Sequence, residues 1–237
     1  MATRYAVVEL DSTESTQDEA RERYEGPRPV LVIAGRQTAG RGRLGRDWLE
    51  PDRAMFASLA FEPAWPIEAW SLIPLAAGSA ARSAIGVFSG VTVGLRWPND
   101  LVVGDGKIGG LLAESGDGIV VIGCGINLLW EEPISGGTAL YETDPGPAIA
   151  AQLAVEWADR LLDSMALHSA DWDVDEYREA CVTIGRSVSY AAGTGIAVGV
   201  SGEGSLLVET ATGVISVHSG EVRLHDRVTL PRDSRRI

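Results

Sequence analysis

Hydrophobic and polar residues alternate along several short stretches of the chain, in the pattern that predicts β-strands. Near the N-terminus we expect strands at 4–10, 30–35 and 54–61, the second of them a buried apolar run, VLVIAG. Further on, 92–103, 107–115 and 118–129 predict three or four more short strands. Glycine and aspartate turns separate them, as is usual between strands of one sheet.

Helical periodicity marks four other segments. These are 11–24, 66–88, 145–167 and 172–181. The first predicts a capped helix that begins near Ser15 or Thr16, because hydroxyl side chains favour the N-cap position. The second is long and alanine-rich, with Pro74 near one of its turns, and its composition predicts a buried helix.

The pattern of the sequence changes near Ile184. From there to Leu230 the short β runs SVSYAA, IAVGV, LLVET, VISVH and EVRLH alternate with glycine turns every eight to ten residues. This spacing predicts a small antiparallel barrel, and the last residues, PRDSRRI, predict a loose tail. We therefore expect two domains, one over 1–183 that contains both strands and helices and a small β domain over 184–237.

The charge of the chain restricts its partners. The formal net charge is −13, which argues against nucleic acid and against an anionic membrane surface as partners. Of the 20 basic residues, 19 are arginines and only Lys107 is a lysine. One explanation is a genome biased towards arginine codons. The other is that this single position requires an ammonium rather than a guanidinium.

The compartment is predicted to be the cytoplasm. The N-terminus has no apolar segment of the signal-peptide type. The most apolar window, 73–88, is interrupted by Arg82 and small residues, so we expect no membrane span. Cys124 and Cys181 are too few for a disulfide framework and predict buried free thiols.

The segment GRGRLG (40–45) satisfies the G-x-G-x-x-G spacing of a dinucleotide-binding turn. That fingerprint requires a helix directly afterwards, whereas Pro51 and a strand pattern follow here. We therefore interpret the segment as an anion-binding loop, in which backbone N–H groups approach a phosphate and Arg41, Arg43 and Arg46 add charged donors. A solvated basic turn of a β-hairpin is the alternative.

Three further segments, 96–101, 104–110 and 122–128, carry candidate binding residues. Asn99 and Asp100 form a predicted turn after a proline. Lys107 follows a glycine without the rest of a Walker loop. The glycines of IGCGINL alternate along a strand, where they weaken packing unless something approaches the backbone closely. Together these features predict a site for a flat ligand beside a phosphate.

Metal and nucleophile motifs are missing from the sequence. The three histidines, His168, His218 and His225, show no ligand spacing, and we expect no protein metal site. No G-x-S-x-G or Cys–His pattern predicts a covalent nucleophile. An enzyme with this sequence would act by positioning and electrostatics.

The motifs STQ (15–17), Gln37 with AGRGRLGRDW, RWPNDL, GDGKIGGLLAE and GCGINL, in this order and spacing, resemble those of the biotin protein ligases. The resemblance covers nearly the whole chain. It implies an α+β catalytic domain, in which helices pack on a mixed sheet, and a small C-terminal SH3-like β-barrel. It also implies that biotin and ATP, with Mg²⁺, form biotinyl-5′-adenylate, and that biotin then passes to a lysine of a biotin carboxyl carrier domain.

The resemblance also implies roles for individual residues. For biotin they are Ser15, Thr16, Gln17, Gln37, Gly40, Arg41, Gly42, Arg43, Lys107, Gly110, Gly123 and Gly125. For ATP and the adenylate they are Arg43, Arg46, Trp48, Asn99, Lys107 and Asn127. Arg41, Arg43 and Lys107 form the catalytic electrostatic clamp, and Asp100 is a candidate general base. We choose Ser15-Thr16 over the earlier pair Ser12-Thr13 because Gln17 and a helix follow; asparagine is commoner in the family at the position of Gln17.

Two alternatives and two further expectations complete the prediction. The chain begins almost at its first strand, which leaves no room for a winged helix, so we expect no repressor role. A homodimer is possible. The first alternative is a lipoate ligase or lipoyl transferase, which are relatives by fold. The second is a non-catalytic regulator that senses biotinyl-adenylate.

Overall fold

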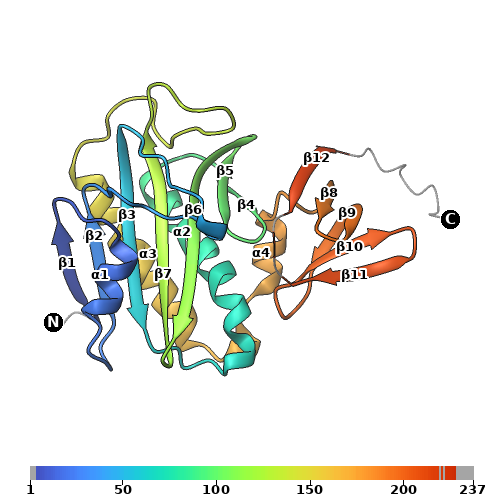
Figure 1. Ribbon diagram of the computed structural model, residues 1–237, viewed down its shortest axis with the longest axis horizontal. Coiled ribbons are helices and arrows are strands. Elements are labelled where there is room, and N and C mark those ends of the chain that lie inside the picture. The colour runs from blue at the N-terminus through green and yellow to red at the C-terminus, as the bar shows by residue number, and fades with distance from the viewer. Residues whose placement is uncertain (1–3, 219, 221, 228–237) are drawn as a thin grey trace.

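The computed structural model describes residues 4–218, 220 and 222–227, and the predicted C-terminal tail lies outside them. Two sheets dominate the fold (Figure 1). The strands of the larger sheet are β1 (Ala6–Leu10), β2 (Val30–Ala34), β3 (Arg53–Phe61), β4 (Gly94–Arg96), β5 (Asp100–Val103), β6 (Gly106–Gly116) and β7 (Ile119–Leu129). Those of the smaller sheet are β8 (Arg186–Tyr190), β9 (Gly193–Val200), β10 (Leu206–Thr210), β11 (Gly213–Val217) and β12 (Arg223–Arg227).

The larger sheet is mixed, as predicted. Its strand order is β1-β2-β3-β7-β6-β5-β4, in which β1 is parallel to β2 and all other neighbours are antiparallel. Four strands, β4 to β7, form in the region where three or four short strands were expected. Two of them, β6 and β7, are longer than expected, with 11 residues each. Asp117 and Gly118 join them in a two-residue turn with positive φ at both positions, the conformation that closes a tight hairpin.

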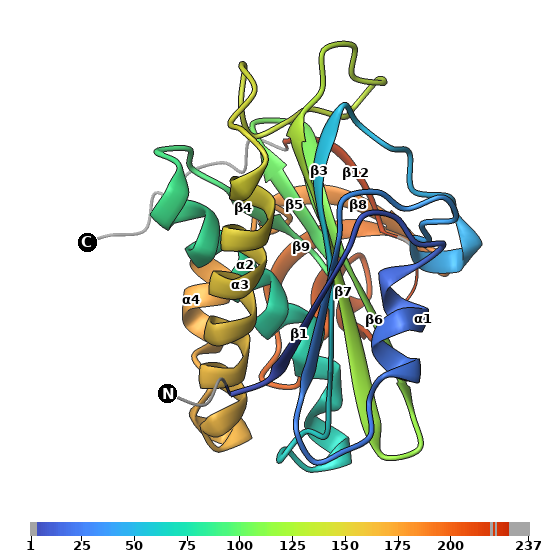
Figure 2. The same ribbon diagram turned by 90° about the vertical axis from the view of Figure 1, so that its left-hand side faces the viewer.

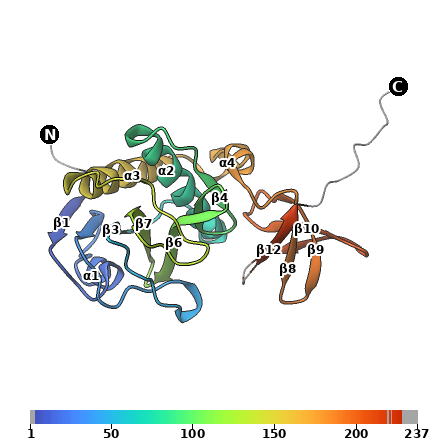
Figure 3. The same ribbon diagram turned by 90° about the horizontal axis from the view of Figure 1, so that it is seen from above.

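Helices cover the two faces of this sheet unequally. The long helices α2 (Ile73–Phe88) and α3 (Ala148–Ala166) lie on one face, and the short α1 (Thr16–Glu22) lies on the other (Figures 2 and 3). Ser15 caps α1, as the sequence predicted. The predicted helix at 66–88 is instead a 3₁₀ turn, Ile67–Leu72, followed by α2, with Pro74 in the first turn of α2, where its missing N–H removes no helical hydrogen bond.

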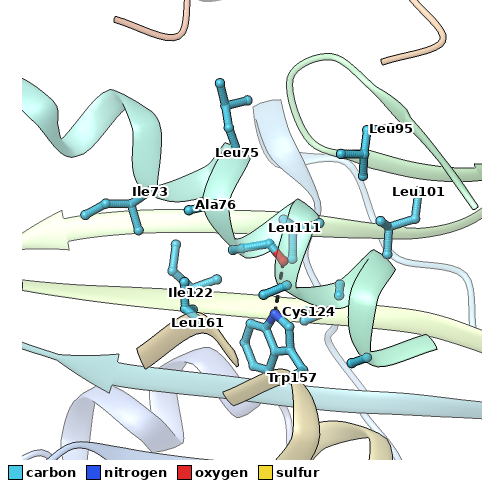
Figure 4. Close-up of a cluster of buried hydrophobic side chains, with 14 of the residues drawn as sticks. Ile73, Leu75, Ala76, Leu95, Leu101, Leu111, Ile122, Cys124, Trp157 and Leu161 are labelled. Atoms are coloured by element: carbon cyan, nitrogen blue, oxygen red, sulfur yellow. Dashed lines mark hydrogen bonds between the residues drawn. The ribbon is translucent and has the colours of Figure 1, made fainter. Parts of the chain in front are cut away.

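The main core fills the space between the large sheet and the pair α2 and α3. Trp157 of α3 is fully buried there, and its indole donates a hydrogen bond to the carbonyl of Ala77 at 3.2 Å (Figure 4). Length and composition alone would let Ile67–Phe88 cross a membrane, but more than half of that window is buried inside this fold. Because α2 and α3 cover only one face, most of the opposite face remains available for a site.

The smaller sheet is antiparallel in the order β11-β10-β9-β8-β12 and lies beyond the β4 edge of the larger one (Figure 1). No pairing joins β11 to β12 among the described residues, so closure of the expected barrel is not observed there. The helix α4 (Val174–Ala180) precedes this sheet. Buried residues of β8, β9 and β10 belong to the same hydrophobic cluster as those of the large sheet. The domain boundary at 183/184 stays a prediction.

Candidate functional site

A cleft of about 780 Å³ opens on the face of the large sheet that carries α1. Its floor consists of glycines, because Gly123 and Gly125 occupy alternate positions of β7 and Gly110 of β6 pairs with Gly125. A Cβ atom on Gly125 would lie 2.9 Å from the ring of Trp48, and one on Gly123 would collide with the side-chain oxygen of Gln17. The floor therefore has no side chains of its own, which lets Gln17 and Trp48 lie directly against its backbone.

A buried polar cluster forms one end of the cleft, at the N-terminus of α1. The backbone N–H of Thr16 donates to Oε1 of Gln37 at 2.7 Å, and the Thr16 hydroxyl lies 3.0 Å from the same oxygen. That hydroxyl also lies 2.8 Å from the hydroxyl of Ser58 on β3. Our sequence analysis missed Ser58. The signal was a single hydroxyl in the otherwise apolar strand AMFASLAF.

Gln17 belongs to this cluster but serves the fold as well. Its Nε2 donates to the carbonyl of Leu112 at 3.2 Å and to that of Val121 at 3.3 Å. Its Oε1 accepts from the hydroxyl of Ser58 at 3.3 Å. An amide has only two hydrogens to donate, so Gln17 can offer a ligand only the remaining capacity of its oxygen.

Residues 40–48 form a short hairpin, which we call the glycine hairpin. The N–H of Gly42 donates to the carbonyl of Arg46 at 2.7 Å, and the N–H of Trp48 donates to that of Gly40 at 2.9 Å. Leu44 and Gly45 at its tip have φ of 59° and 70°. Strand β3, rather than a helix, follows, so the interpretation against a dinucleotide fingerprint is confirmed.

Two arginines attach the glycine hairpin to opposite sides of the cleft. Arg41 makes a bidentate ion pair with Asp18 of α1, at 2.6 and 2.7 Å. The hydrogen bonds from Arg41 hold the pKa of the Asp18 carboxyl below its usual range. Arg43 donates to Oδ1 of Asn99 at 2.8 Å and to the carbonyl of Gly220 at 3.0 Å. The hairpin thus crosses the cleft from α1 to the small sheet.

Lys107 lies at the start of β6, above the glycine floor. Its Nζ is 2.7 Å from Oδ1 of Asp100, and it stands 5.6 Å from the centre of the Trp48 ring. A Cβ atom on Gly110 would approach Nζ to 3.3 Å. The ammonium is therefore held between a carboxylate, an aromatic face and bare backbone.

Trp48 and Asn127 each present a polar atom with no partner among the described residues. The Trp48 ring covers the floor at Gly125, and its Nε1 is buried without an acceptor. Asn127 is 4% exposed; its Nδ2 donates to the carbonyl of Thr138 at 2.9 Å, while its Oδ1 has no donor. A buried polar atom without a partner is costly, so one donor and one acceptor are available to a ligand here.

The cleft is rich in positive charge although the whole chain is acidic. Among the residues that the structure describes, seven basic side chains line it and three acidic ones do, Asp47, Asp100 and Asp105. The basic ones are Arg41, Arg43, Arg46, Arg96, Lys107, Arg186 and Arg223. In a chain with a net charge of −13, such local excess creates a potential that attracts a small anion. The sequence analysis gave no role to Arg96, although it begins the motif RWPNDL, and it missed Arg186 and Arg223, which no local motif marks.

The structure brings nearly all of the sequence-predicted residues to this one cleft. Those that line it are Ser15, Thr16, Gln17, Gln37, Arg41, Gly42, Arg43, Arg46, Trp48, Asn99, Lys107, Gly110, Gly123, Gly125 and Asn127. Gly40 is not part of the lining. A Cβ atom there would lie 3.1 Å from Nε2 of Gln37 and 3.2 Å from Cβ of Trp48, so its role is to let these two side chains pack.

The fold and the cleft define an α+β protein built to bind and position a small anionic ligand. Among the described residues no group of three or more His, Cys, Asp or Glu side chains could hold a metal ion. The sequence model of the biotin/lipoate A/B protein ligase family matches residues 7–127, and that of the biotin protein ligase C terminal domain matches 183–224. The chain belongs to the biotin/lipoate A/B protein ligase family. The C-terminal match places it with the biotin protein ligases.

Individual relatives agree with this placement. The chain is 32% identical to the biotin–[acetyl-CoA-carboxylase] ligase of Mycobacterium tuberculosis, over 81% of this chain and 78% of that protein. It is 29% identical to the enzyme of the same name from Paracoccus denitrificans, over 90% of this chain and 98% of the relative. Among solved structures, the Aquifex aeolicus biotin protein ligase in complex with biotin and ATP matches with a TM-score of 0.78 and 26% identity, over 93% and 98% of the two chains.

Proposed function

We propose that this chain activates biotin with ATP to biotinyl-5′-AMP and transfers biotin to a specific lysine of a biotin carboxyl carrier domain. The names of its relatives support this reaction, and so does the Aquifex aeolicus neighbour, which holds biotin and ATP. The observation that carries the proposal is the cleft itself, in which a ring of cations stands beside a glycine floor with a polar cluster at one end.

In the first half-reaction a carboxylate oxygen of biotin attacks the α-phosphorus of ATP, and pyrophosphate leaves. Both reactants are anions, so their repulsion must be screened before they can meet in line. Lys107, Arg43 and Arg41 line the cleft and would provide this screening, Arg41 from beside α1. Mg²⁺ would arrive on the ATP phosphates, because such sites use few protein ligands.

The polar cluster and the unpartnered atoms divide the cleft between the two halves of the adenylate. Thr16, Gln37 and Ser58 offer hydroxyl and amide groups to the ureido head of biotin at the α1 end. Trp48 and Asn127 offer an aromatic face and the two free polar atoms to the nucleotide. Between them the glycine floor contributes no side chain that would reduce the space for the ligand.

In the second half-reaction the amine of the acceptor lysine attacks the carbonyl carbon of the mixed anhydride. The bond to the phosphate oxygen breaks, AMP leaves, and the amine loses a proton. Asp100 remains the candidate base, although in the structure its Oδ1 forms an ion pair with Nζ of Lys107 at 2.7 Å. The adenylate is prone to hydrolysis, so a hairpin that crosses the cleft also has the purpose of excluding water.

One experiment tests the proposal directly. The chain is incubated with ATP, Mg²⁺, a biotin carboxyl carrier domain and, in separate samples, biotin or lipoic acid, and the carrier is weighed by mass spectrometry. A gain equal to one biotin, dependent on ATP, supports the proposal. Modification with lipoic acid instead would favour the lipoate ligase alternative, and adenylate binding without transfer would favour the non-catalytic regulator.

The proposal also covers the cellular compartment, the partners and the oligomeric state of the enzyme. We place the enzyme in the cytoplasm, where Cys124 and Cys181, both buried free thiols in the structure, would remain reduced. The acidic surface makes nucleic acid an unfavourable partner. A homodimer remains a prediction, which sedimentation of the purified chain would test.

A further inference from the structure

The glycine hairpin is attached at both sides of the cleft, and the two attachments differ in character. At the small sheet, Arg43 donates to Asn99 and to Gly220, and these contacts are partly buried. At α1, Arg41 pairs with Asp18, with side chains 42% and 50% exposed. Water and salt compete with an exposed ion pair far more than with buried hydrogen bonds. The α1 attachment is therefore the one that opens more easily.

The α1 attachment also stands beside the polar cluster. Asp18 follows Thr16 and Gln17 directly in the first turn of α1, and Arg41 follows Gly40, which packs against Gln37. The pair therefore joins the hairpin to the helix whose first residues form the head-group end of the cleft.

Asp18 lies in the first turn of α1, where a negative side chain is favourable, but Arg41 holds its carboxylate. The N-cap of α1 is Ser15, whose hydroxyl accepts from the backbone N–H of Asp18 at 3.5 Å. The Asp18 side chain does not line the cleft. Its carboxylate oxygens instead accept one hydrogen bond each from Nη1 and Nη2 of Arg41, the planar two-bond geometry that distinguishes a specific pair from a chance contact.

We infer that Asp18 is a positioning residue that holds Arg41, and through it the glycine hairpin, over the head-group end of the cleft. It thereby slows the escape of bound biotin and limits the access of water to the adenylate. This inference rests on the proposed function. It assigns Asp18 to the retention of the ligand rather than to the chemical step.

The test compares release of biotin from four versions of the full chain. Each is loaded with tritiated biotin, and release is followed after addition of excess unlabelled biotin. Asp18→Asn removes the charge while nearly keeping the shape, and Asp18→Glu restores the charge. Glu22→Gln is the matched control, because it removes one exposed acidic charge from the other end of the same helix. Thermal unfolding of each version shows that the fold is retained.

We expect Asp18→Asn to release biotin about two to five times faster than the unmodified chain, the range that an exposed ion pair supports. Glu22→Gln should release it at the unmodified rate, and Asp18→Glu should recover most of the loss. In roughly 1 M salt, where charges are screened within about 3 Å, the unmodified chain should approach the rate of Asp18→Asn. The KM for biotin should rise in Asp18→Asn by a larger factor than kcat for pyrophosphate release falls, because the Arg41 guanidinium itself is retained.

Two results would overturn the inference alone. One is equal release from Asp18→Asn and the unmodified chain. The other is equally fast release from Glu22→Gln, which would reveal a general effect of charge. If the unmodified chain binds no tritiated biotin at all, the proposed function itself fails, and the inference fails with it.

Discussion

Replacing the single lysine of the cleft by arginine separates two explanations of its presence. If codon bias left Lys107 in place by chance, Lys107→Arg should be nearly silent, because arginine serves everywhere else in the chain. If its ammonium must contact the biotin carboxylate and the α-phosphate together, arginine should fail. A guanidinium is planar, larger and presents its donors in a rigid fork, whereas an ammonium acts as a compact point charge.

The surroundings of Lys107 define the size of the effect. Its Nζ is already within 2.7 Å of Asp100, and a Cβ on Gly110 would approach it to 3.3 Å, so there is little room for a larger head. Losing one preorganised donor costs about 2–4 kcal/mol of transition-state stabilisation, which is roughly a 30- to 900-fold slower reaction. The ion pair is partly exposed and arginine keeps its charge, so the free energy of unfolding should change by less than about 1 kcal/mol.

Pyrophosphate release with biotin, ATP and Mg²⁺ measures this effect directly. A matched control is Arg160→Lys, which makes the reverse exchange in an ion pair with Glu156 on the surface of α3 and should leave the rate unchanged. Turnover of Lys107→Arg at the unmodified rate, with an unchanged fold, would refute the role of Lys107 as the central cation of the site.

Three further outcomes are expected. Gly125→Ala should weaken biotin binding by tenfold or more, because its new Cβ would lie 2.9 Å from the Trp48 ring. Gly86→Ala on the exposed side of α2, where a Cβ meets nothing within 4 Å, is the control, and equal affinities in calorimetry would contradict this account of the floor. Biotin should raise the thermal midpoint, and biotin with ATP should raise it further, since a ligand at 100 times its Kd adds about 2.7 kcal/mol; no shift at millimolar biotin would refute biotin as the ligand. Burial raises the pKa of the Cys124 thiol, so the folded state keeps its proton while the unfolded thiol loses it above about pH 8.5. The free energy of unfolding should therefore fall as the pH rises beyond that value, and it should fall less steeply in Cys124→Ala. If urea unfolding gives the same pH dependence for both proteins, the Cys124 thiol makes no such contribution.

The sequence predicted the elements of the fold well because their signals are local. The cap at Ser15, the buried strand VLVIAG and the tight turn at Asp117-Gly118 each depend on residues within a few positions of one another. The break before Pro74 and the length of β6 and β7 were less predictable. They depend on packing between α2 and the sheet and on pairing across the sheet, which no short window of sequence contains.

The residues of the candidate site also fall into two groups, those that local motifs reveal and those that only the fold brings together. The glycine floor and Lys107 lie in motifs that can be read from sequence. Ser58 and Arg223 are brought to the cleft by strands whose place is fixed only in three dimensions. The ion pair between Arg41 and Asp18 joins residues 23 positions apart, and a sequence offers no rule for choosing this acid among many.

The arrangement of the cleft also limits where substrate choice can be made. Biotin and lipoic acid share a carboxylate, so the cations around Lys107 would treat them alike. The floor is bare backbone and distinguishes little by chemistry. The polar cluster is the part of the cleft that can prefer biotin to lipoic acid. The ureido group of biotin can hydrogen-bond to Thr16 and Gln37, whereas the apolar dithiolane of lipoic acid cannot. An apolar head would displace water from these groups without offering hydrogen bonds in return, and this uncompensated desolvation is the physical basis for selecting biotin.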